Sequence, residues 1–267
     1  MTTLPLKMKA LAAYASPPTD GGSGYHYTFE IIEIDTPQVS SPEDLIVQLE
    51  SCPINPSDLG RFKFGGLAYR GTGNMPVQSG PGKITTAITP QIVESQRLNT
   101  TAKILGNEGS GVVVAAGEMC KDLIGKKVAV KSGTSYAQYT KVNKASAVVL
   151  PDDYECDDGA SVFVNPLTVC GFVQTMHSEG HKAIAHTAAG SQLGQMLLKY
   201  CKSEGIPLVN IVRKEETVAL LKSLGAEYVI NTSSETFKRE LIDALKATEC
   251  TLAFDATGGG TLASDLL

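Results

Sequence analysis

The sequence has 267 residues, of which 42% are hydrophobic and 19% are charged, and its net charge is -5. This composition is that of a globular protein with one large domain or two ordinary ones. Nothing in the sequence resembles the basic stripe by which many proteins bind nucleic acid, so we expect no nucleic-acid partner. No apolar run approaches the 18 residues of a transmembrane helix, so we also expect no membrane span.

Cysteine usage points to a reducing compartment. The six cysteines include no pair with C-x-x-C spacing, and several lie in apolar periodic runs. We therefore expect reduced and mostly buried thiols, and a cytoplasmic protein. The apolar stretch ALAAYA near the N-terminus is shorter than the hydrophobic region of a signal peptide, so we interpret it as the first strand.

Residues 1–150 predict a β-rich domain of short strands separated by Gly, Pro and Asp turns. The predicted strands after the first are 27–34, 44–51, 108–117, 126–132 and 145–151. Between about 65 and 101 the pattern lapses into a segment rich in Gly, Pro and Thr. We interpret that segment as an inserted loop, because it is too long for an ordinary connection.

Residues 151–267 alternate between strand and helix patterns, which predicts an α/β domain with a parallel sheet. The predicted strands are 181–188, 207–213, 226–231 and 251–257. A complete dinucleotide-binding Rossmann sheet has about six strands, in the order 3-2-1-4-5-6. We therefore expect a Rossmann domain that is incomplete after its fourth strand.

The turn after the first of these strands, HTAAGSQLGQ (186–195), is a candidate phosphate-binding site. Small residues at such a turn let backbone N–H groups approach a pyrophosphate at the helix N-terminus. The usual G-x-G-x-x-G reads Ala189-x-Ser191-x-x-Gly194 here, and only the last glycine is kept. The predicted cofactor-binding residues of this turn are Ala189, Gly190, Ser191, Gln192, Leu193 and Gly194.

The end of the second strand suggests which coenzyme this turn would take. An acidic residue there would bind the ribose 2′-hydroxyl of NAD, but the sequence has Arg213 and Lys214. Cations suit a 2′-phosphate, because Arg forms paired charge-assisted hydrogen bonds with it. The sequence therefore favours NADPH over NADH. The alternative is that both side chains lie on a solvated helix start.

Six motifs in this order resemble the medium-chain dehydrogenase/reductase superfamily. They are INPSDLG (54–60), GNEGSGVVVAAG (106–117), SYAQY (135–139), NPLTVCGF (165–172), HTAAGSQLGQ (186–195) and LKSLGAEYVINT (221–232). Within the superfamily the chain looks most like the zinc-free quinone oxidoreductases and the related enoyl-thioester reductases. The resemblance implies a GroES-like domain over 1–150, followed by a Rossmann domain, with cofactor and substrate in the cleft between them.

The resemblance also bears on metal binding. Zinc-dependent members carry a ligand Cys where this chain has Asn55, and a ligand His where it has Asn107. A neutral Asn is a poor zinc ligand beside a thiolate or an imidazole, so we expect no metal. Alcohol oxidation would then lack a Lewis acid to stabilise the alkoxide, whereas hydride transfer to an activated acceptor remains feasible.

Further site residues follow from the resemblance alone. Asn55 and Asp58 match the cleft-lining NPxD motif, and Thr168 matches the family threonine near the nicotinamide. Tyr69 lies close to the position of the proton-donating tyrosine of enoyl-thioester reductases. The predicted catalytic residues are thus Asn55, Asp58, Tyr69 and Thr168, of which Thr168 also contacts the cofactor. The alternative for Asn55 and Asp58 is an Asn-Pro turn with its cap.

These observations predict an NADPH-dependent, zinc-independent reductase of quinones or other conjugated carbonyls. One alternative is an enoyl-thioester (enoyl-CoA or enoyl-ACP) reductase, and another is an NADPH-binding protein without turnover, as in the lens crystallins recruited from this family. The expected partner is a small quinone or enone. Family dimers often use late Rossmann strands, which this sequence does not contain. The sequence therefore leaves open whether the protein forms a homodimer.

Overall fold

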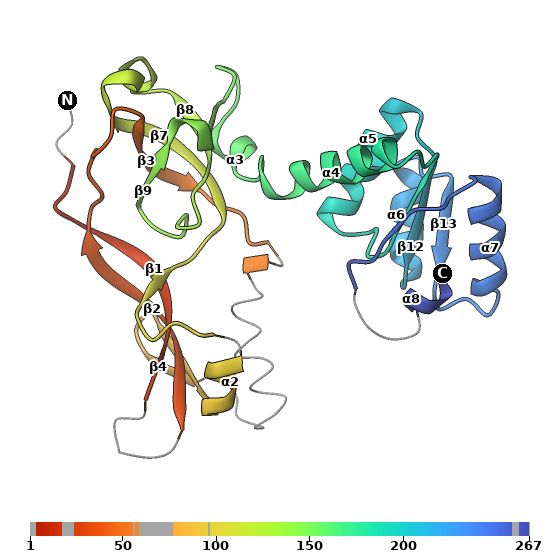
Figure 1. The fold of residues 1–267 in the computed structure, drawn as a ribbon, viewed down its shortest axis with the longest axis horizontal. Coiled ribbons are helices and arrows are strands. Elements are labelled where there is room, and N and C mark those ends of the chain that lie inside the picture. The colour runs from red at the N-terminus through yellow and green to blue at the C-terminus, as the bar shows by residue number, and fades with distance from the viewer. Residues whose placement is uncertain are drawn as a thin grey trace. The chain divides into compact units, whose positions relative to one another are not determined.

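A computed structural model describes residues 4–17, 24–55, 57–58, 77–95, 97–257 and 262–266 of the chain. The chain divides into two compact units, residues 1–164 and residues 165–267. Figure 1 shows the antiparallel strands of the first unit and the helices and parallel strands of the second.

The first unit contains two five-stranded antiparallel sheets. One has the order β4 (Val77–Gly80), β5 (Lys83–Ile88), β2 (Tyr25–Asp35), β1 (Lys7–Ser16) and β6 (Lys103–Ile104). The other has the order β10 (Ala147–Val149), β8 (Lys127–Lys131), β7 (Glu108–Ala116), β3 (Asp44–Ser51) and β9 (Tyr139–Asn143). Of the short helices, α2 (Pro90–Ser95) lies between β5 and β6, η1 (Glu118–Leu123) between β7 and β8, and η2 (Lys144–Ser146) between β9 and β10, while α3 (Cys156–Gly159) follows β10. The predicted antiparallel β-rich fold is confirmed.

The prediction of an inserted loop at 65–101 is wrong over residues 77–95, while 65–76 lie outside the described residues. Strands β4 and β5 form an antiparallel hairpin, and β5 pairs with β2 along residues 25–30. Only Thr86 and Ile88 of β5 are buried, so its hydrophobic alternation is weak. The strand is stabilised by pairing with β2, which local sequence does not reveal.

The first unit continues past residue 150, where the second domain was predicted to begin. Helix α3 packs against β3, β7 and β8, so residues beyond 150 belong to the β-rich unit. The side chain of Ser110 donates to the backbone carbonyl of Cys156, which ties this helix to β7. The unit ends at Val164, the first residue of helix α4 (Val164–Ser178).

The second unit is a four-stranded parallel sheet with helices on both faces. Its order is β13 (Tyr228–Asn231), β12 (Leu208–Val212), β11 (Ile184–His186) and β14 (Ala253–Phe254). The remaining helices are α5 (Gln192–Glu204), α6 (Glu215–Ser223), α7 (Phe237–Ala247) and α8 (Leu262–Asp265). The described strands follow the predicted sequence order 3-2-1-4 of a Rossmann sheet.

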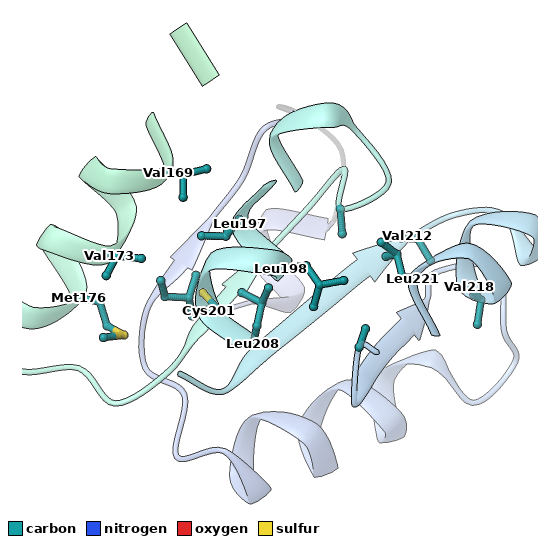
Figure 2. Packing of buried hydrophobic residues seen from close by; sticks show 13 residues of the cluster. Val169, Val173, Met176, Leu197, Leu198, Cys201, Leu208, Val212, Val218 and Leu221 are labelled. Carbon is teal, nitrogen blue, oxygen red and sulfur yellow. The ribbon is translucent and has the colours of Figure 1, made fainter. Parts of the chain in front are cut away.

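Alternate strand residues separate the two cores of this unit. Ile184, Leu208 and Val212 face a cluster that contains apolar side chains of α4, α5 and α6. Figure 2 shows Val169, Val173 and Met176 of α4 directed toward Leu197 and Cys201 of α5. Ala185, Val209, Ile211 and Ile230 pack instead with Phe237, Leu241 and Ala244 of α7. This alternation is why the strands read as continuous apolar runs.

Candidate functional site

In the first unit, the buried carboxylate of Asp58 connects two segments that are far apart in sequence. Its Oδ2 accepts the backbone N–H of Asn55 at 2.9 Å, and its Oδ1 accepts the backbone N–H of Asn107 at 3.1 Å. Gly106 has φ +96°, and a Cβ there would lie 2.6 Å from the backbone nitrogen of Tyr136. The turn that delivers Asn107 to Asp58 therefore requires glycine.

A second buried carboxylate, Glu108, lies beside Asn55. Its Oε1 accepts from Nδ2 of Asn55 at 2.8 Å. Its Oε2 accepts the backbone N–H groups of Phe163 and Val164 at 2.7 and 3.0 Å. Because Val164 begins α4, the anion lies at a helix N-terminus, where the helix dipole favours negative charge. Glu108 thus connects the NPSD segment to the start of α4.

Tyr136 and Cys52 border these carboxylates, and the sequence reasoning gave neither a role. The Tyr136 hydroxyl donates to the Pro53 carbonyl at 2.9 Å, and Cys52 Sγ donates to the Ser135 carbonyl at 2.9 Å. Burial, with the negative charge of Asp58 as a further cause, raises the pKa of Tyr136 and raises the pKa of Cys52 to about 11. Both groups are therefore protonated at neutral pH. The SYAQY motif was the available signal for Tyr136.

The positions of the family's zinc ligands are occupied by amides already engaged in hydrogen bonds. Nδ2 of Asn55 donates to Glu108, and Nδ2 of Asn107 donates to Oγ of Ser57 at 3.0 Å. A carboxamide offers zinc neither a thiolate nor an imidazole. Within the described residues, no group of three or more His, Cys, Asp or Glu side chains is placed to hold a metal. The residues present do not fit a catalytic zinc ion.

In the second unit, the turn between β11 and α5 has the features of a phosphate site. Ser191 is the N-cap of α5, and its Oγ accepts the backbone N–H of Gly194 at 3.1 Å. A Cβ at Gly194 would lie 2.2 Å from the carbonyl oxygen of Ala189, so the retained glycine permits this close packing. The N–H groups of Gln192 and Leu193 have no intrahelical acceptor at a helix start, and the first turn of α5 carries no acidic residue. The turn therefore fits an anionic phosphate.

Arg213 lies immediately after β12, and Lys214 is at the N-cap position of α6. A Cβ on Gly190 would lie 2.3 Å from the side chain of Thr217, in the first turn of α6. The phosphate turn and the start of α6 are therefore in contact. Ser233 donates its hydroxyl to the Arg213 carbonyl at 2.9 Å, which fixes the chain there. Both cationic side chains are exposed, so they are accessible to a ligand.

The sequence reasoning missed Thr187 and Asp255, which follow β11 and β14. Oγ1 of Thr187 donates to Oδ1 of Asp255 at 2.7 Å and accepts the backbone N–H of Ala256 at 2.8 Å. Strands β11 and β14 are neighbours although they are first and fourth in sequence. Ligands of open α/β sheets bind at such a topological switch point. The polar residues after two adjacent strands were the available signal.

The remaining predicted residues are placed as follows. Thr168 lies half-buried in α4, in the second unit. Tyr69 lies outside the described residues. His186, the first residue of the predicted phosphate turn, is buried and its Nε2 lies 3.1 Å from Oδ1 of Asn210, while burial lowers its pKa. The structure brings Asn55 together with Asp58, and the phosphate turn together with the first turn of α6, which follows Arg213. The functional roles of these residues remain predictions.

Comparison with known proteins identifies the family. Residues 193–267 match the family model described as zinc-binding dehydrogenase, a segment that contains neither Asn55 nor Asn107. A candidate NADPH:quinone reductase from Mesorhizobium loti is 30% identical, and its crystal structure matches 99% of this chain and 71% of its own with a TM-score of 0.72. The chain belongs to the quinone oxidoreductase-like branch of the medium-chain dehydrogenase/reductase superfamily. Its first unit is the GroES-like β-rich unit of that fold, and its second is the Rossmann-like unit.

Other relatives support this assignment. A quinone oxidoreductase from Pseudomonas aeruginosa is 28% identical over 61% of this chain and 51% of its own length. A mitochondrial enoyl-[acyl-carrier-protein] reductase from Xenopus tropicalis is 27% identical over 86% of this chain and 60% of its own. The chain therefore spans about half to three fifths of the length of these curated relatives.

Among the helices that the structure describes, none has both the length and the apolar character of a membrane-spanning helix.

Proposed function

We propose that the protein is an NADPH-dependent, zinc-independent oxidoreductase that transfers hydride to quinones or other conjugated carbonyls. The observation that carries the proposal is the Ser191-capped turn, which contacts the first turn of α6, the helix that follows Arg213 and Lys214. The Escherichia coli quinone oxidoreductase, crystallised with NADPH, shares the fold with a TM-score of 0.68 at 18% identity. That likeness supports the fold, and the coenzyme choice rests on the residues of this chain.

The residues of the second unit fit NADPH in two places. The N–H groups at the start of α5 would hold the pyrophosphate, which is the anion that such a helix end binds. Arg213 would bind the 2′-phosphate, with Lys214 adding positive charge. When bound, NADPH supplies the hydride, and the protein supplies alignment and electrostatics.

The chemistry of the acceptor follows from the amides at Asn55 and Asn107. Because neither residue can hold a Lewis acid, the acceptor must itself delocalise the charge that it receives with the hydride. Quinones and enones do so through their conjugated carbonyl. The remaining contribution of the protein is to orient the two reactants, which can supply a large part of the rate.

A second candidate is reduction of an enoyl thioester. It is favoured by the relatives, because the mitochondrial enoyl-[acyl-carrier-protein] reductase from Xenopus tropicalis aligns over 86% of this chain. A 2-enoyl thioester is also a conjugated carbonyl, but its reduction needs a proton at the carbon next to the carbonyl. Tyr69 is the predicted donor of that proton.

Steady-state oxidation of NADPH separates these functions. Purified protein is given a benzoquinone, a 2-enoyl-CoA or no acceptor, and NADPH absorbance is followed. The proposal expects faster consumption with the quinone, and faster consumption with the enoyl-CoA would favour the second candidate. In that case Tyr69→Phe should abolish enoyl reduction. Binding of NADPH without consumption across both acceptors would favour a crystallin-like protein without turnover and would overturn the proposal.

A further inference from the structure

The turn that follows β13, residues 231–234, fixes the segment that leads into α6. The backbone N–H of Thr232 donates to the carbonyl of Val212 at 2.8 Å, and Oγ of Ser233 donates to the carbonyl of Arg213 at 2.9 Å. Both bonds end on backbone carbonyls of that segment. Its position therefore does not depend on its own side chains.

A third bond from the same turn holds a side chain. Nδ2 of Asn231 donates to Oε2 of Glu215 at 3.0 Å. Oδ1 of Asn231 accepts the backbone N–H of Ser233 at 3.0 Å. Because a carboxamide has one donating and one accepting end, the bond to Ser233 leaves Nδ2 as the end that faces Glu215. The Asn231 amide therefore presents its donor to a carboxylate in the first turn of α6.

The place of Glu215 in the sequence makes this bond relevant to the coenzyme. Glu215 directly follows Arg213 and Lys214, and all three side chains are exposed. These cations are the predicted ligands of the 2′-phosphate, which as a phosphate monoester carries a charge of about -1.5 to -2 at neutral pH. A carboxylate beside them would repel the phosphate and compete for the cations. In the described part of the chain, Glu215 bonds to Asn231 and forms no ion pair with either cation.

We propose that Asn231 is a positioning residue that determines coenzyme specificity, because it directs the Glu215 carboxylate toward the end of β13 and away from the 2′-phosphate of NADPH. This inference rests on the proposed function. Without the amide, the carboxylate is released beside Lys214 and opposes the phosphate. NADH has a 2′-hydroxyl at this position, and a carboxylate accepts a hydrogen bond from that group. Asn231 therefore acts on the coenzyme through Glu215.

The variant Asn231→Ala releases Glu215 and tests the proposal by titration with NADPH and with NADH. We expect the dissociation constant of NADPH to rise roughly threefold to tenfold, because a carboxylate and a phosphate at the protein surface repel each other through screened charges. The dissociation constant of NADH should not rise, since the released carboxylate can accept from its ribose hydroxyl. A merely structural role of Asn231 would weaken both nucleotides equally.

The double variant Asn231→Ala/Glu215→Gln separates the charge of Glu215 from the shape of the turn. Gln has nearly the same size as Glu but no charge, so its release cannot repel the phosphate. Relative to Glu215→Gln alone, the added Asn231→Ala change should alter the ratio of the two dissociation constants by less than about twofold. The loss of NADPH selectivity should therefore require the Glu215 carboxylate.

Asn143→Ala is the matched control, because Asn143 makes the same pair of hydrogen bonds in the first unit. Its Nδ2 donates to Oε2 of Glu43 at 3.0 Å, and its Oδ1 accepts the backbone N–H of Ala145 at 2.9 Å. This variant should bind both nucleotides like the wild type. An equal loss of selectivity in this control would count against a specific role of Asn231.

Asn231→Asp gives a second test, should Asn231→Ala fail to fold by circular dichroism. It keeps the volume and the acceptor for the N–H of Ser233, but it replaces the donor with a carboxylate oxygen that repels Glu215. NADPH selectivity should again be lost. In Asn231→Asp/Glu215→Gln, the Gln NH₂ donates to the Asp, so the negative charge returns to the end of β13 and selectivity should recover.

Three results would overturn the inference: an unchanged ratio of the dissociation constants in Asn231→Ala, equal weakening of both nucleotides, or a loss of selectivity that persists in the Glu215→Gln background. For the second test, the absence of recovery in Asn231→Asp/Glu215→Gln would contradict it. Failure of the proposed function is a different outcome, because the wild type would then bind no NADPH or would prefer NADH. Titration of the wild type therefore distinguishes the two failures.

Discussion

Oγ1 of Thr187 lies 2.7 Å from Oδ1 of Asp255 and joins the carboxyl ends of β11 and β14. Thr187 is buried, and its hydroxyl also accepts the backbone N–H of Ala256. Asp255 in turn accepts the backbone N–H of Thr257 at 2.9 Å. The two strands share few ladder hydrogen bonds, since β14 has two residues, so these side chains fix how the strands end.

We predict that Thr187→Val lowers the free energy of unfolding by about 1–3 kcal/mol, because it removes a bond to a carboxylate and leaves a backbone N–H without its partner. Urea denaturation followed by circular dichroism measures this, since the chain has no Trp. Combining Thr187→Val with Asp255→Ala should cost less than the sum of the two single changes. Strict additivity would show that the two residues do not act together.

Ala188, in the phosphate turn, adopts φ +53°, a left-handed conformation that costs a non-glycine residue about 1–2 kcal/mol. We predict that Ala188→Gly raises the free energy of unfolding by about 0.5–1 kcal/mol, because the relief of strain exceeds the entropy that glycine loses on folding. The neighbouring Ala189 is fully buried, so Ala189→Gly should destabilise the same turn. Denaturation without coenzyme checks both, and destabilisation by Ala188→Gly would contradict the assignment of strain.

His186 makes the second unit sensitive to acid. The amide of Asn210 donates to the carbonyls of Leu208 and Tyr228, so its Oδ1 accepts from Nε2–H of a neutral His186. Burial lowers the pKa of His186, so the folded state resists the proton that the unfolded state takes up below the ordinary histidine value of about 6.5. Stability is therefore present above that value and is lost as the pH falls, by at most about 1.4 kcal/mol per pH unit.

Replacing His186 checks this linkage. Gln keeps an N–H donor but does not titrate, so His186→Gln should show a smaller loss of stability between neutral and mildly acidic pH. The two proteins are compared by the slope of the free energy of unfolding against pH, because a core substitution also lowers that free energy at every pH. Equal slopes in the two proteins would mean that other groups account for the acid sensitivity.

The sequence predicted the elements whose stability comes from their own periodicity. Strand β3 was predicted at its observed bounds, and the four strands of the second unit were predicted in their observed order. Residues 83–88 were not recognised as a strand, because β5 has few apolar residues and depends on β2 for its hydrogen bonds. Long-range pairing of that kind leaves no local pattern.

The candidate site was predictable only in part, for a related reason. The phosphate turn and Arg213 occupy fixed positions relative to strands, so spacing along the chain identifies them. Glu108 was not predicted as a site residue, because its partners Asn55, Phe163 and Val164 are more than 50 positions away in sequence. The same contacts explain why the first unit ends at Val164 rather than near residue 150.

The preference for NADPH is the central claim, and titration of Arg213→Ala with NADPH and with NADH tests it most directly. The nucleotide's own fluorescence reports binding, and Arg239→Ala, an exposed arginine on α7, is the matched control. We predict that Arg213→Ala raises the dissociation constant of NADPH roughly ten- to 150-fold, because it removes one hydrogen bond between charged groups. The dissociation constant of NADH should stay nearly unchanged. Equal weakening of both nucleotides, or no effect on either, would contradict the account.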